Sequence, residues 1–326
     1  MPARPSLPVT APAPVDPVRL HQPVLAWYAT HARDLPWRRP GTSPWAVLVS
    51  EVMLQQTPVA RVEPVYSEWV ARWPTPAALA AEPTGEAVRA WGRLGYPRRA
   101  LRLHAAATEV VARHGGELPT TYDALRALPG VGDYTAAAVA SFAHGGRHAV
   151  LDTNVRRVLA RLVGGEAEAA PAVTVAERRR AEALLPDDDP EDDPDDDPGA
   201  DGPGRAARWA VAVMELGALV CTARSPVCPG CPVADRCAWL LAGRPPATGE
   251  HPRRRAQRFE GTDRQARGRL LAVVRSADAP VPVAELAAAW PEPVQRDRAL
   301  TGLLHDGLVD QTADGYALPG FAGRPG

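Results

Sequence analysis

Apolar side chains recur at intervals of three and four residues through most of the chain, which is the spacing of helices that each bury one face. Residues 18–32 show this spacing from Leu20 to Tyr28. Pro and Gly mark the joints between such segments, and strand signals are almost absent before residue 300. The pattern therefore predicts an all-α body of many short helices. Further helices are expected at 45–56, 62–72, 76–81, 85–93, 98–114, 121–127, 133–143, 153–163, 173–185 and 205–219.

A different order of elements is expected after residue 260. Three helices precede a two-strand hairpin, which is the order of a winged helix. In a winged helix Arg296 and Arg298 would face DNA, whereas the plainer alternative is a small cap that makes no DNA contact. The helices are expected at 262–276, 283–290 and 292–306, and the strands in LVDQT and YALP on either side of a turn at Ala313, Asp314 and Gly315.

The net charge of −1 conceals an uneven distribution. Residues 186–204 carry ten acidic residues and no basic one, so the remainder has 28 acidic against 37 basic residues, a net charge of +9. A basic folded part is typical of a protein that binds a polyanion, although a solvated basic surface is the plainer alternative. The acidic block cannot bury a core and is expected to be a disordered insertion.

Nothing in the pattern indicates a membrane protein. The longest apolar candidate, Trp209 to Cys221, is interrupted by Glu215 and is shorter than the ~18 residues of a membrane-spanning helix. The Pro- and Ala-rich start of the chain lacks the apolar run of a signal peptide. Free cysteines imply a reducing interior, so we expect a cytoplasmic, nucleoid-associated monomer.

All four cysteines lie within 17 residues, as Cys221, Cys228, Cys231 and Cys237, with the spacing C-x6-C-x2-C-x5-C. Four thiolates this close can hold an iron–sulfur cluster or zinc. Zinc sites usually have two short C-x2-C pairs far apart, whereas this chain has one short pair in a loop broken by Pro and Gly. The spacing favours a [4Fe–4S] cluster over zinc.

Two glycines punctuate the segment LPGVG at 128–132, between two expected helices. Gly130 and Gly132 permit a tight turn, so the N–H groups of Gly130, Val131 and Gly132 are expected to point at one spot. Such groups bind phosphate without a side chain. This is the helix-hairpin-helix pattern, which binds the DNA backbone without sequence specificity; a plain corner between helices is the alternative.

Glu51 lies in the apolar segment AVLVSEVML. An ionised carboxylate is costly to bury there, so the pKa of Glu51 is expected to rise and the group to hold a proton near neutral pH. The alternative is that Glu51 faces solvent on an amphipathic helix. Thr57 and Pro58 are expected to be the N-cap and first residue of the next helix, and Asp152 is expected to cap helix 153–163.

Six motifs in one order along residues 20–242 together resemble the MutY family of adenine DNA glycosylases, in the endonuclease III, helix-hairpin-helix superfamily. They are EVMLQQT at 51–57, LGY at 94–96, LPGVG at 128–132, LDTNVRRV at 151–158, MELGA at 214–218 and the four cysteines. The resemblance implies base excision repair of double-stranded DNA in which adenine opposite 8-oxoguanine or guanine is flipped out and removed by hydrolysis of its N-glycosidic bond.

The resemblance also implies residue roles. Glu51 would protonate the adenine ring and then help to activate water, while Asp152 would stabilise the oxocarbenium-like sugar; two carboxylates with opposite protonation preferences suit this reaction. Tyr134 would orient the acid and the sugar, and Asn154 is typical of the family. Residues that fill or probe the opened base stack would be Gln55, Gln56, Thr57 and Leu94, and the cysteines would hold a structural [4Fe–4S] cluster in a loop where Arg224 and Arg236 contact phosphate.

Three features depart from the family. Thr153 stands where glycine is usual, Pro97 follows Tyr96 where a second aromatic residue is usual, and the segment after residue 260 is too short for the Nudix-like domain that reads 8-oxoguanine. The closest alternative enzyme is an endonuclease III-like lyase acting on oxidised pyrimidines. Such lyases carry a Schiff-base lysine at the position of Tyr134, and a phenol cannot replace it. A catalytically idle DNA-binding protein is the alternative of another class.

The expected organisation is therefore a two-lobed, all-α helix-hairpin-helix glycosylase with an iron–sulfur loop and a small winged-helix-like unit. Its parts are a disordered tail at 1–15, a six-helix barrel at 35–150, an iron–sulfur domain formed by 16–34 and 151–242 with the acidic insertion at 186–204, a Pro- and Arg-rich linker at 243–260 and the C-terminal unit at 261–326.

Overall fold

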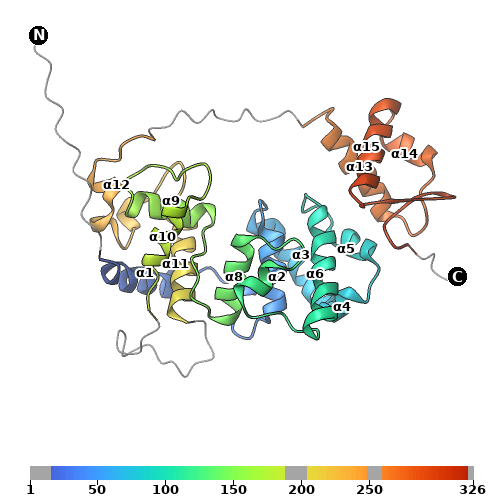
Figure 1. Cartoon of the computed structure of the whole chain (residues 1–326). Helices are drawn as coiled ribbons and strands as arrows, with labels where there is room; N and C mark the ends of the chain where they lie inside the picture. The colour runs from blue at the N-terminus through green and yellow to red at the C-terminus, as the bar shows by residue number, and fades with distance from the viewer. Residues whose placement is uncertain (1–15, 188–203, 248–258, 322–326) are drawn as a thin grey trace, which may run out of the picture. The chain divides into compact units, whose positions relative to one another are not determined.

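The computed structural model describes residues 16–187, 204–247 and 259–321 (Figure 1). The expected tail and most of the acidic insertion and of the linker lie outside these ranges. The chain divides into two compact units: a first unit of residues 1–34 with 140–252, and a second unit of residues 35–139 with 253–326. No helix in the described ranges is long and apolar enough to span a membrane.

The first unit is helical and is built around α1, α9 and α11. Leu20, Val155 and Leu216, one from each helix, are among the buried side chains of its core. At the C-terminal end of α11 the chain enters the cysteine loop, which contains two short 3-10 turns and a short helix that local periodicity does not predict. The elements are α1 (Val18–His31), α9 (Thr153–Leu162), α10 (Val175–Ala183), α11 (Arg205–Leu219), η3 (Cys228–Gly230), η4 (Ala234–Arg236) and α12 (Ala238–Leu241).

The second unit begins with a bundle of short helices around one apolar helix, α2. Ser43 caps α2 by accepting a hydrogen bond from the Ala46 N–H (3.2 Å), and Pro44 follows at its first position. Residues 45–53 of α2 are all buried, as expected for a helix at the centre of a bundle. The elements are η1 (Pro36–Arg38), α2 (Pro44–Leu54), α3 (Val59–Arg72), α4 (Pro76–Ala80), α5 (Thr84–Trp91), α6 (Arg98–His114), α7 (Tyr122–Arg126) and α8 (Asp133–His144), the last of which crosses the division between the units.

One predicted cap is wrong. Helix α3 begins at Val59 with Pro58 at its N-cap, and the Thr57 side chain does not cap it. The Thr57 hydroxyl instead accepts a hydrogen bond from the Arg99 guanidinium (2.9 Å). A partner 42 residues away has therefore taken the hydroxyl that local sequence assigns to the helix start.

The C-terminal segment has the predicted order of three helices and a hairpin. These are α13 (Asp263–Ser276), α14 (Val283–Ala289), α15 (Pro293–His305), β1 (Asp310–Thr312) and β2 (Gly315–Ala317). The strands pair antiparallel with Gln311 opposite Tyr316, and Gly315, expected in the turn, is the first residue of β2. Val281 pairs with Tyr316 on the other side of the hairpin.

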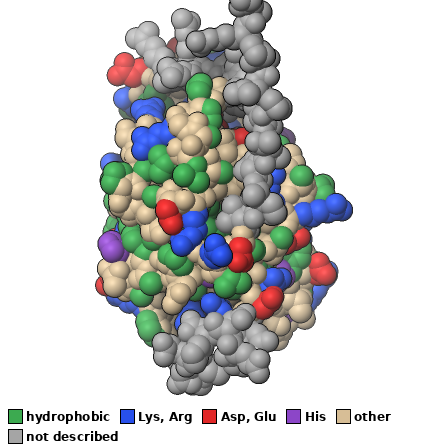
Figure 2. Space-filling model, turned by 90° about the vertical axis from the view of Figure 1, so that its left-hand side faces the viewer, with side chains coloured by type: hydrophobic (Ala, Val, Ile, Leu, Met, Phe, Trp, Pro, Cys, Tyr) green, Lys and Arg blue, Asp and Glu red, His purple; other side chains and the backbone are tan. Residues whose placement is uncertain are grey.

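The two arginines expected to face DNA in this segment already have partners. Arg298 forms a bidentate ion pair with Asp263 (2.7 and 2.6 Å), and Arg296 donates to the Trp290 carbonyl (3.1 Å). Their guanidinium groups hold α15 to its neighbours, so the expected DNA-facing role is not supported. On the face shown in Figure 2, basic side chains stand singly or in small groups among acidic and hydrophobic ones.

Candidate nucleic-acid interface and catalytic residues

Glu51 is buried in α2, with 6% of its surface exposed. Its neighbours Val49 and Val52 are buried as well, because α2 is enclosed on all sides. The expectation of a buried acid is confirmed, and the alternative of a solvent-facing glutamate is wrong. One turn after Glu51 the helix ends at Leu54, and the chain passes into the exposed Gln56, which has a positive φ of 54°.

The helix-hairpin-helix turn connects α7 to α8. Gly130 has a φ of +79°, and a Cβ there would lie 2.6 Å from Cβ of Arg102, so only glycine fits. The Val131 N–H donates to the Leu128 carbonyl (3.1 Å) and is not available to a ligand, which corrects one of the three predicted donors. The N–H groups of Gly130 and Gly132 have no hydrogen-bond partner within the described residues, and Gly132 faces open space.

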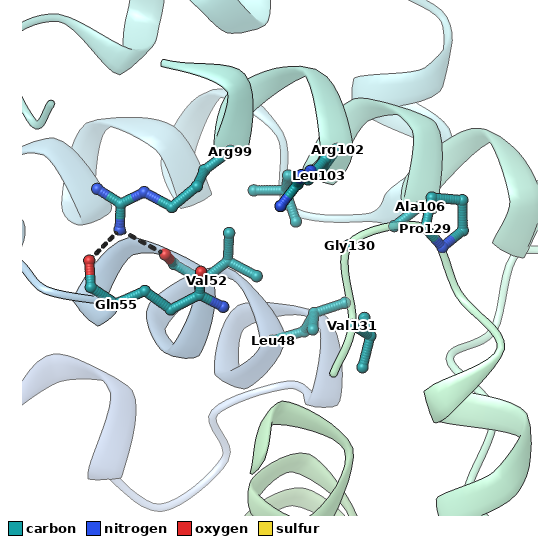
Figure 3. A pocket seen from close by; sticks show the side chains of 10 residues that line it. All are labelled: Leu48, Val52, Gln55, Arg99, Arg102, Leu103, Ala106, Pro129, Gly130 and Val131. Carbon is teal, nitrogen blue, oxygen red and sulfur yellow. Dashed lines mark hydrogen bonds between the residues drawn. The ribbon is translucent and has the colours of Figure 1, made fainter. Parts of the chain in front are cut away.

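A small pocket lies between this turn and the end of α2 (Figure 3). Gln55 and Arg99 line one side and Pro129 to Val131 the other. The Gln55 amide also donates to the Thr135 hydroxyl on α8 (3.3 Å), so Gln55 joins α2 to the second helix of the hairpin. The pocket thus brings residues of two predicted DNA-binding segments, 55–57 and 130–132, to one place.

Arg99, which sequence reasoning missed, organises this region from α6. Its guanidinium is buried, with 6% of the residue exposed, and donates to four backbone carbonyls and one hydroxyl. Burial lowers the pKa of Arg99 to about 10. The spacing of apolar residues in the sequence could have indicated that Arg99 is buried, because Arg99 lies on the same face of α6 as Leu103, Ala106 and Val110. The acceptors are the carbonyls of Val52 (2.9 Å), Met53 (3.0 Å), Gln55 (2.6 Å) and Gly95 (3.1 Å) and the Thr57 hydroxyl (2.9 Å).

The loop 92–96 is held by donors along its length. The Gly95 carbonyl accepts from the Trp91 indole (2.9 Å) in addition to Arg99, the Leu94 carbonyl accepts weakly from the Thr57 hydroxyl (3.5 Å), and the Arg93 carbonyl accepts from Arg61. Only a restrained loop would keep Tyr96, which is not a glycine, at a φ of 48°. Tyr96 is 51% exposed at the end of this loop.

Two of the predicted stack-probing side chains are buried rather than exposed. Leu94 is 3% exposed and Thr57 is 7% exposed, so these side chains support the loop from within. The exposed side chains of the segments 55–57 and 92–96 are Gln56, Arg93 and Tyr96. The predicted contacts of Leu94 and Thr57 with an opened base stack are therefore not available to their side chains in this arrangement.

Asp152 in the first unit caps α9 as predicted. One carboxylate oxygen accepts from the Val155 N–H (2.6 Å), and the other accepts from the Asn154 amide (3.0 Å). Burial raises the pKa of Asp152, although the hydrogen bonds from Val155 and Asn154 oppose this by favouring the ionised form. Asn154 therefore fixes the orientation of the carboxylate to which the family resemblance gives a role at the sugar.

Arg157 connects this cap to the cysteine loop. It donates to the Asn154 side-chain oxygen (2.8 Å) and to the carbonyls of Gly217 (2.7 Å) and Cys221 (2.7 Å). Gly217 explains one of the family motifs, because a Cβ there would lie 2.7 Å from Cβ of Asn154. Helix α11 can approach the start of α9 only where it carries no side chain.

The glutamate of the same motif has a structural partner. Glu215 is fully buried and accepts from the Arg33 side chain (2.7 and 2.8 Å) and from the Arg33 N–H (3.1 Å). These bonds raise the pKa of Arg33. Since a buried carboxylate is costly without such partners, Arg33 and Glu215 fix the chain after α1 to the core of the first unit.

The four cysteines are half-buried, and three of them pack against the core of the first unit. Arg161 on α9 lies beside them, donating to the Thr222 carbonyl (2.8 Å) and to Sγ of Cys221 (3.4 Å), with its guanidinium over the Trp239 ring. Burial raises the pKa of Cys231 to about 11 and also raises the pKa of Cys237. A donor set of four thiols beside a positive charge fits an iron–sulfur cluster, which they would ligate as thiolates.

Predicted phosphate contacts in this loop differ in their surroundings. Arg224 is exposed, whereas Arg236 is half-buried and lies 3.6 Å from the Asp235 carboxylate. Tyr134 is half-buried near the start of α8. Glu51 and Tyr134 belong to the second unit, and Asp152, Asn154 and the cysteines belong to the first.

Comparison with known proteins finds two family models that match the chain. Residues 49–182 match the HhH-GPD superfamily of base excision DNA repair proteins, and residues 221–237 match the iron-sulfur binding domain of endonuclease III. The prediction of an iron–sulfur cluster rather than zinc is confirmed, and the cofactor is a [4Fe–4S] cluster. A thermostable thymine-DNA glycosylase of known structure has a TM-score of 0.60 at 27% identity, covering 69% of this chain and 97% of its own.

Sequence relatives extend the similarity to nearly the whole chain. The chain is 52% identical over 299 residues to an adenine DNA glycosylase of Mycobacterium tuberculosis, covering 91% of this chain and 92% of the relative. It is 51% identical over 315 residues to an adenine DNA glycosylase of Mycolicibacterium smegmatis, covering 95% and 99%. Because 299 aligned residues exceed the 260 that precede the C-terminal segment, the alignment includes part of that segment. The chain therefore belongs to the adenine DNA glycosylase family, within the HhH-GPD superfamily of base excision DNA repair proteins.

Proposed function

We propose that this protein removes adenine from double-stranded DNA where adenine is mispaired with 8-oxoguanine or guanine. The observation that carries the proposal is Glu51, an acid buried in the apolar helix α2 one turn before the exposed Gln56. Burial favours the protonated form of a carboxylic acid, and a protonated acid is what a departing base needs. The relatives named adenine DNA glycosylase support adenine as that base.

The reaction divides between two carboxyl groups. Glu51 gives its proton to a ring nitrogen of adenine as the bond from C1′ to the base breaks and its electron pair moves onto the base. Asp152 accepts hydrogen bonds from Val155 and Asn154 that favour its ionised form, and as a carboxylate it stabilises the cationic sugar. Glu51, now a carboxylate, accepts a proton from the water that adds to C1′, which leaves an abasic site and restores the acid. Tyr134 orients Glu51 and the sugar.

The chain offers no side-chain amine for the alternative lyase reaction. Its 326 residues contain no lysine at all, so the 37 basic residues are all arginine. A bifunctional glycosylase of the endonuclease III type needs a lysine to form a Schiff base with the sugar. Glycosylase activity without lysine-dependent strand cleavage is the function that these residues support.

Single-turnover release of adenine from a duplex with one adenine opposite 8-oxoguanine tests the proposal. Glu51→Gln should lower the rate by at least ~10²–10⁴-fold, because an amide cannot donate the proton, while duplex binding persists. Glu68→Gln, which alters an exposed glutamate of α3, is the matched control and should keep the wild-type rate. A Glu51→Gln protein that releases adenine at the wild-type rate would show that Glu51 is not the acid.

The mispair preference is tested with the same protein on three duplexes. Adenine opposite 8-oxoguanine or guanine should be released, and adenine opposite thymine should not. Equal rates on all three duplexes would contradict the proposed substrate.

A further inference from the structure

The C-terminal segment lies directly against α5 of the same unit. The Gly85 N–H donates to the Pro319 carbonyl (2.8 Å). A Cβ at Gly85 would lie 2.7 Å from that carbonyl oxygen and 2.7 Å from Cβ of Leu318. Glycine is a weak helix former, and the close approach of the two backbones explains why one is present at this position of α5. The glycine in α5 therefore permits the close contact with the C-terminal segment.

Arginines reinforce this contact in both directions. Arg89 of α5 donates to the carbonyls of Arg275 and Ala277 (3.0 Å for the latter) at the end of α13. Arg275 in turn donates to the carbonyl of Gly92, at the start of the loop 92–96. Arg98 and Asp306 form an ion pair (3.3 Å). The C-terminal segment thus holds one end of the loop that carries Tyr96.

This docking brings the first turn of α13 to Tyr96. The Arg264 guanidinium lies 5.7 Å from the centroid of the Tyr96 ring and 6.0 Å from that of Phe259. All three side chains are exposed, Tyr96 by 51% and Phe259 by 55%. We call these three residues the aromatic–arginine cluster. Arg264 has no ion-pair partner within the described residues, unlike Arg298.

Exposed aromatic rings beside an unpaired guanidinium are the chemistry by which proteins hold nucleic acid strands. Aromatic rings stack on bases, and a guanidinium both stacks and donates hydrogen bonds to phosphate oxygens. Large exposed aromatic side chains otherwise expose apolar surface to water without a compensating contact. The cluster also adjoins the loop that α2 and α6 hold through Arg99.

We propose that the aromatic–arginine cluster is a DNA-contacting surface, and that the C-terminal segment and the last residues of the linker complete it by supplying Arg264 and Phe259 beside Tyr96. This inference rests on the proposed function, since it takes DNA as the ligand. It gives the C-terminal segment a role in duplex binding through α13, instead of through Arg296 and Arg298 on α15.

The test compares two arginines of α13. Arg264→Ala removes the cluster cation, and Arg269→Ala removes an exposed arginine that lies over Trp290 within the C-terminal segment (5.5 Å). Binding is measured by fluorescence anisotropy at several salt concentrations, with a duplex that carries a non-hydrolysable adenosine analogue opposite 8-oxoguanine. Arg264→Ala should weaken binding roughly five- to tenfold, and Arg269→Ala less than twofold.

The salt dependence separates a phosphate contact from stacking. The slope of log K against log salt concentration is negative, and loss of one phosphate contact makes it less steep by about 0.9. Arg264→Lys keeps the charge and loses the planar group, so it should keep the slope and bind with intermediate affinity. Equal affinities for Arg264→Ala and Arg269→Ala would overturn the proposal.

A second perturbation leaves every side chain of the cluster in place. Gly85→Val should displace the C-terminal segment from α5 and weaken binding as much as Arg264→Ala does. Gly268→Ala is its control, because a Cβ at Gly268 meets nothing within 4 Å. If Gly85→Val retains wild-type affinity, the C-terminal segment does not complete the surface. Binding is measured without base release. A wild-type protein that binds the duplex but releases no adenine would therefore contradict the proposed function without contradicting this inference.

Discussion

Replacement of Arg99 by alanine should destabilise the second unit more than replacement of any other single arginine in residues 35–139. The guanidinium makes five hydrogen bonds to buried or half-buried acceptors at the end of α2 and in the loop 92–96. At about 1.5 kcal/mol for each hydrogen bond made by a charged group, these contribute roughly 7 kcal/mol.

Burial of the charge opposes this contribution. The pKa of Arg99 is lowered to about 10 from 12.5, which at ~1.4 kcal/mol for each pH unit corresponds to roughly 3 kcal/mol. The difference, about 4 kcal/mol, is the expected loss for Arg99→Ala and lies in the range for breaking a buried polar network. For a domain of ~150–250 residues such a loss lowers Tm by roughly 8–16 °C.

Calorimetry of the full chain measures the effect. Arg102→Ala is the matched control, because Arg102 lies on the next turn of α6 and is exposed, and surface substitutions usually change stability by no more than ~0.5 kcal/mol. Arg99→Lys should fall between the two, since an ammonium group cannot reach all five acceptors. If Arg99→Ala melts within about 2 °C of the wild-type protein, water has replaced the guanidinium and the network does not hold the loop.

Two further substitutions test the first unit. Gly217→Ala should slow adenine release by roughly tenfold or more with little change in iron content, because the added Cβ would lie 2.7 Å from Asn154, which orients Asp152; an unchanged rate would mean that α11 yields without moving Asn154. Asp152→Asn should abolish adenine release yet leave Tm unchanged or higher at pH 7. Burial raises the pKa of Asp152 in the folded protein, so ionisation of this group lowers the stability of the wild-type protein at a pH above that folded-state pKa. The cost disappears as the pH falls below the pKa of the same group in the unfolded chain. Thermal melts from pH 3 to pH 8 should therefore show the gap between Asp152→Asn and wild type closing as the pH falls, and a variant less stable than wild type at pH 7 would contradict the assigned cause.

Helix positions followed from the sequence because they depend on local periodicity. The bounds of α6 and α11 agree with the expected segments to the residue, and Gly115 ends α6 in the left-handed conformation (φ 63°). The cap at Asp152 was likewise predictable, because it depends on the residues next to it along the chain. The apolar neighbours of Glu51 indicated a buried acid but left a solvent-facing glutamate open, and only the packing of α2 decides between the two.

Contacts between distant segments were not predictable in this way. The period of α6 marks Arg99 as buried but gives no hint that it bonds carbonyls more than 40 residues away. The same limit explains the Thr57 hydroxyl, which a distant arginine took from its expected role as a cap, and the burial of Leu94. Gly85 and Gly217 look like weak helix formers in the sequence, and only the approach of another backbone reveals their purpose.

The double role of Asp152 distinguishes two kinds of inactive variant in a cell. A helix cap accepts Asn, Ser or Thr almost as well as Asp, so a substitution that removes the negative charge leaves α9 correctly started and the protein at normal abundance. Loss of Arg99, by contrast, exposes the chain to proteolysis and lowers its amount. On the proposed function, a stable Asp152 variant would still bind the DNA from which it cannot release adenine and would shield that site from other repair enzymes, whereas loss of Arg99 would leave the site accessible to them.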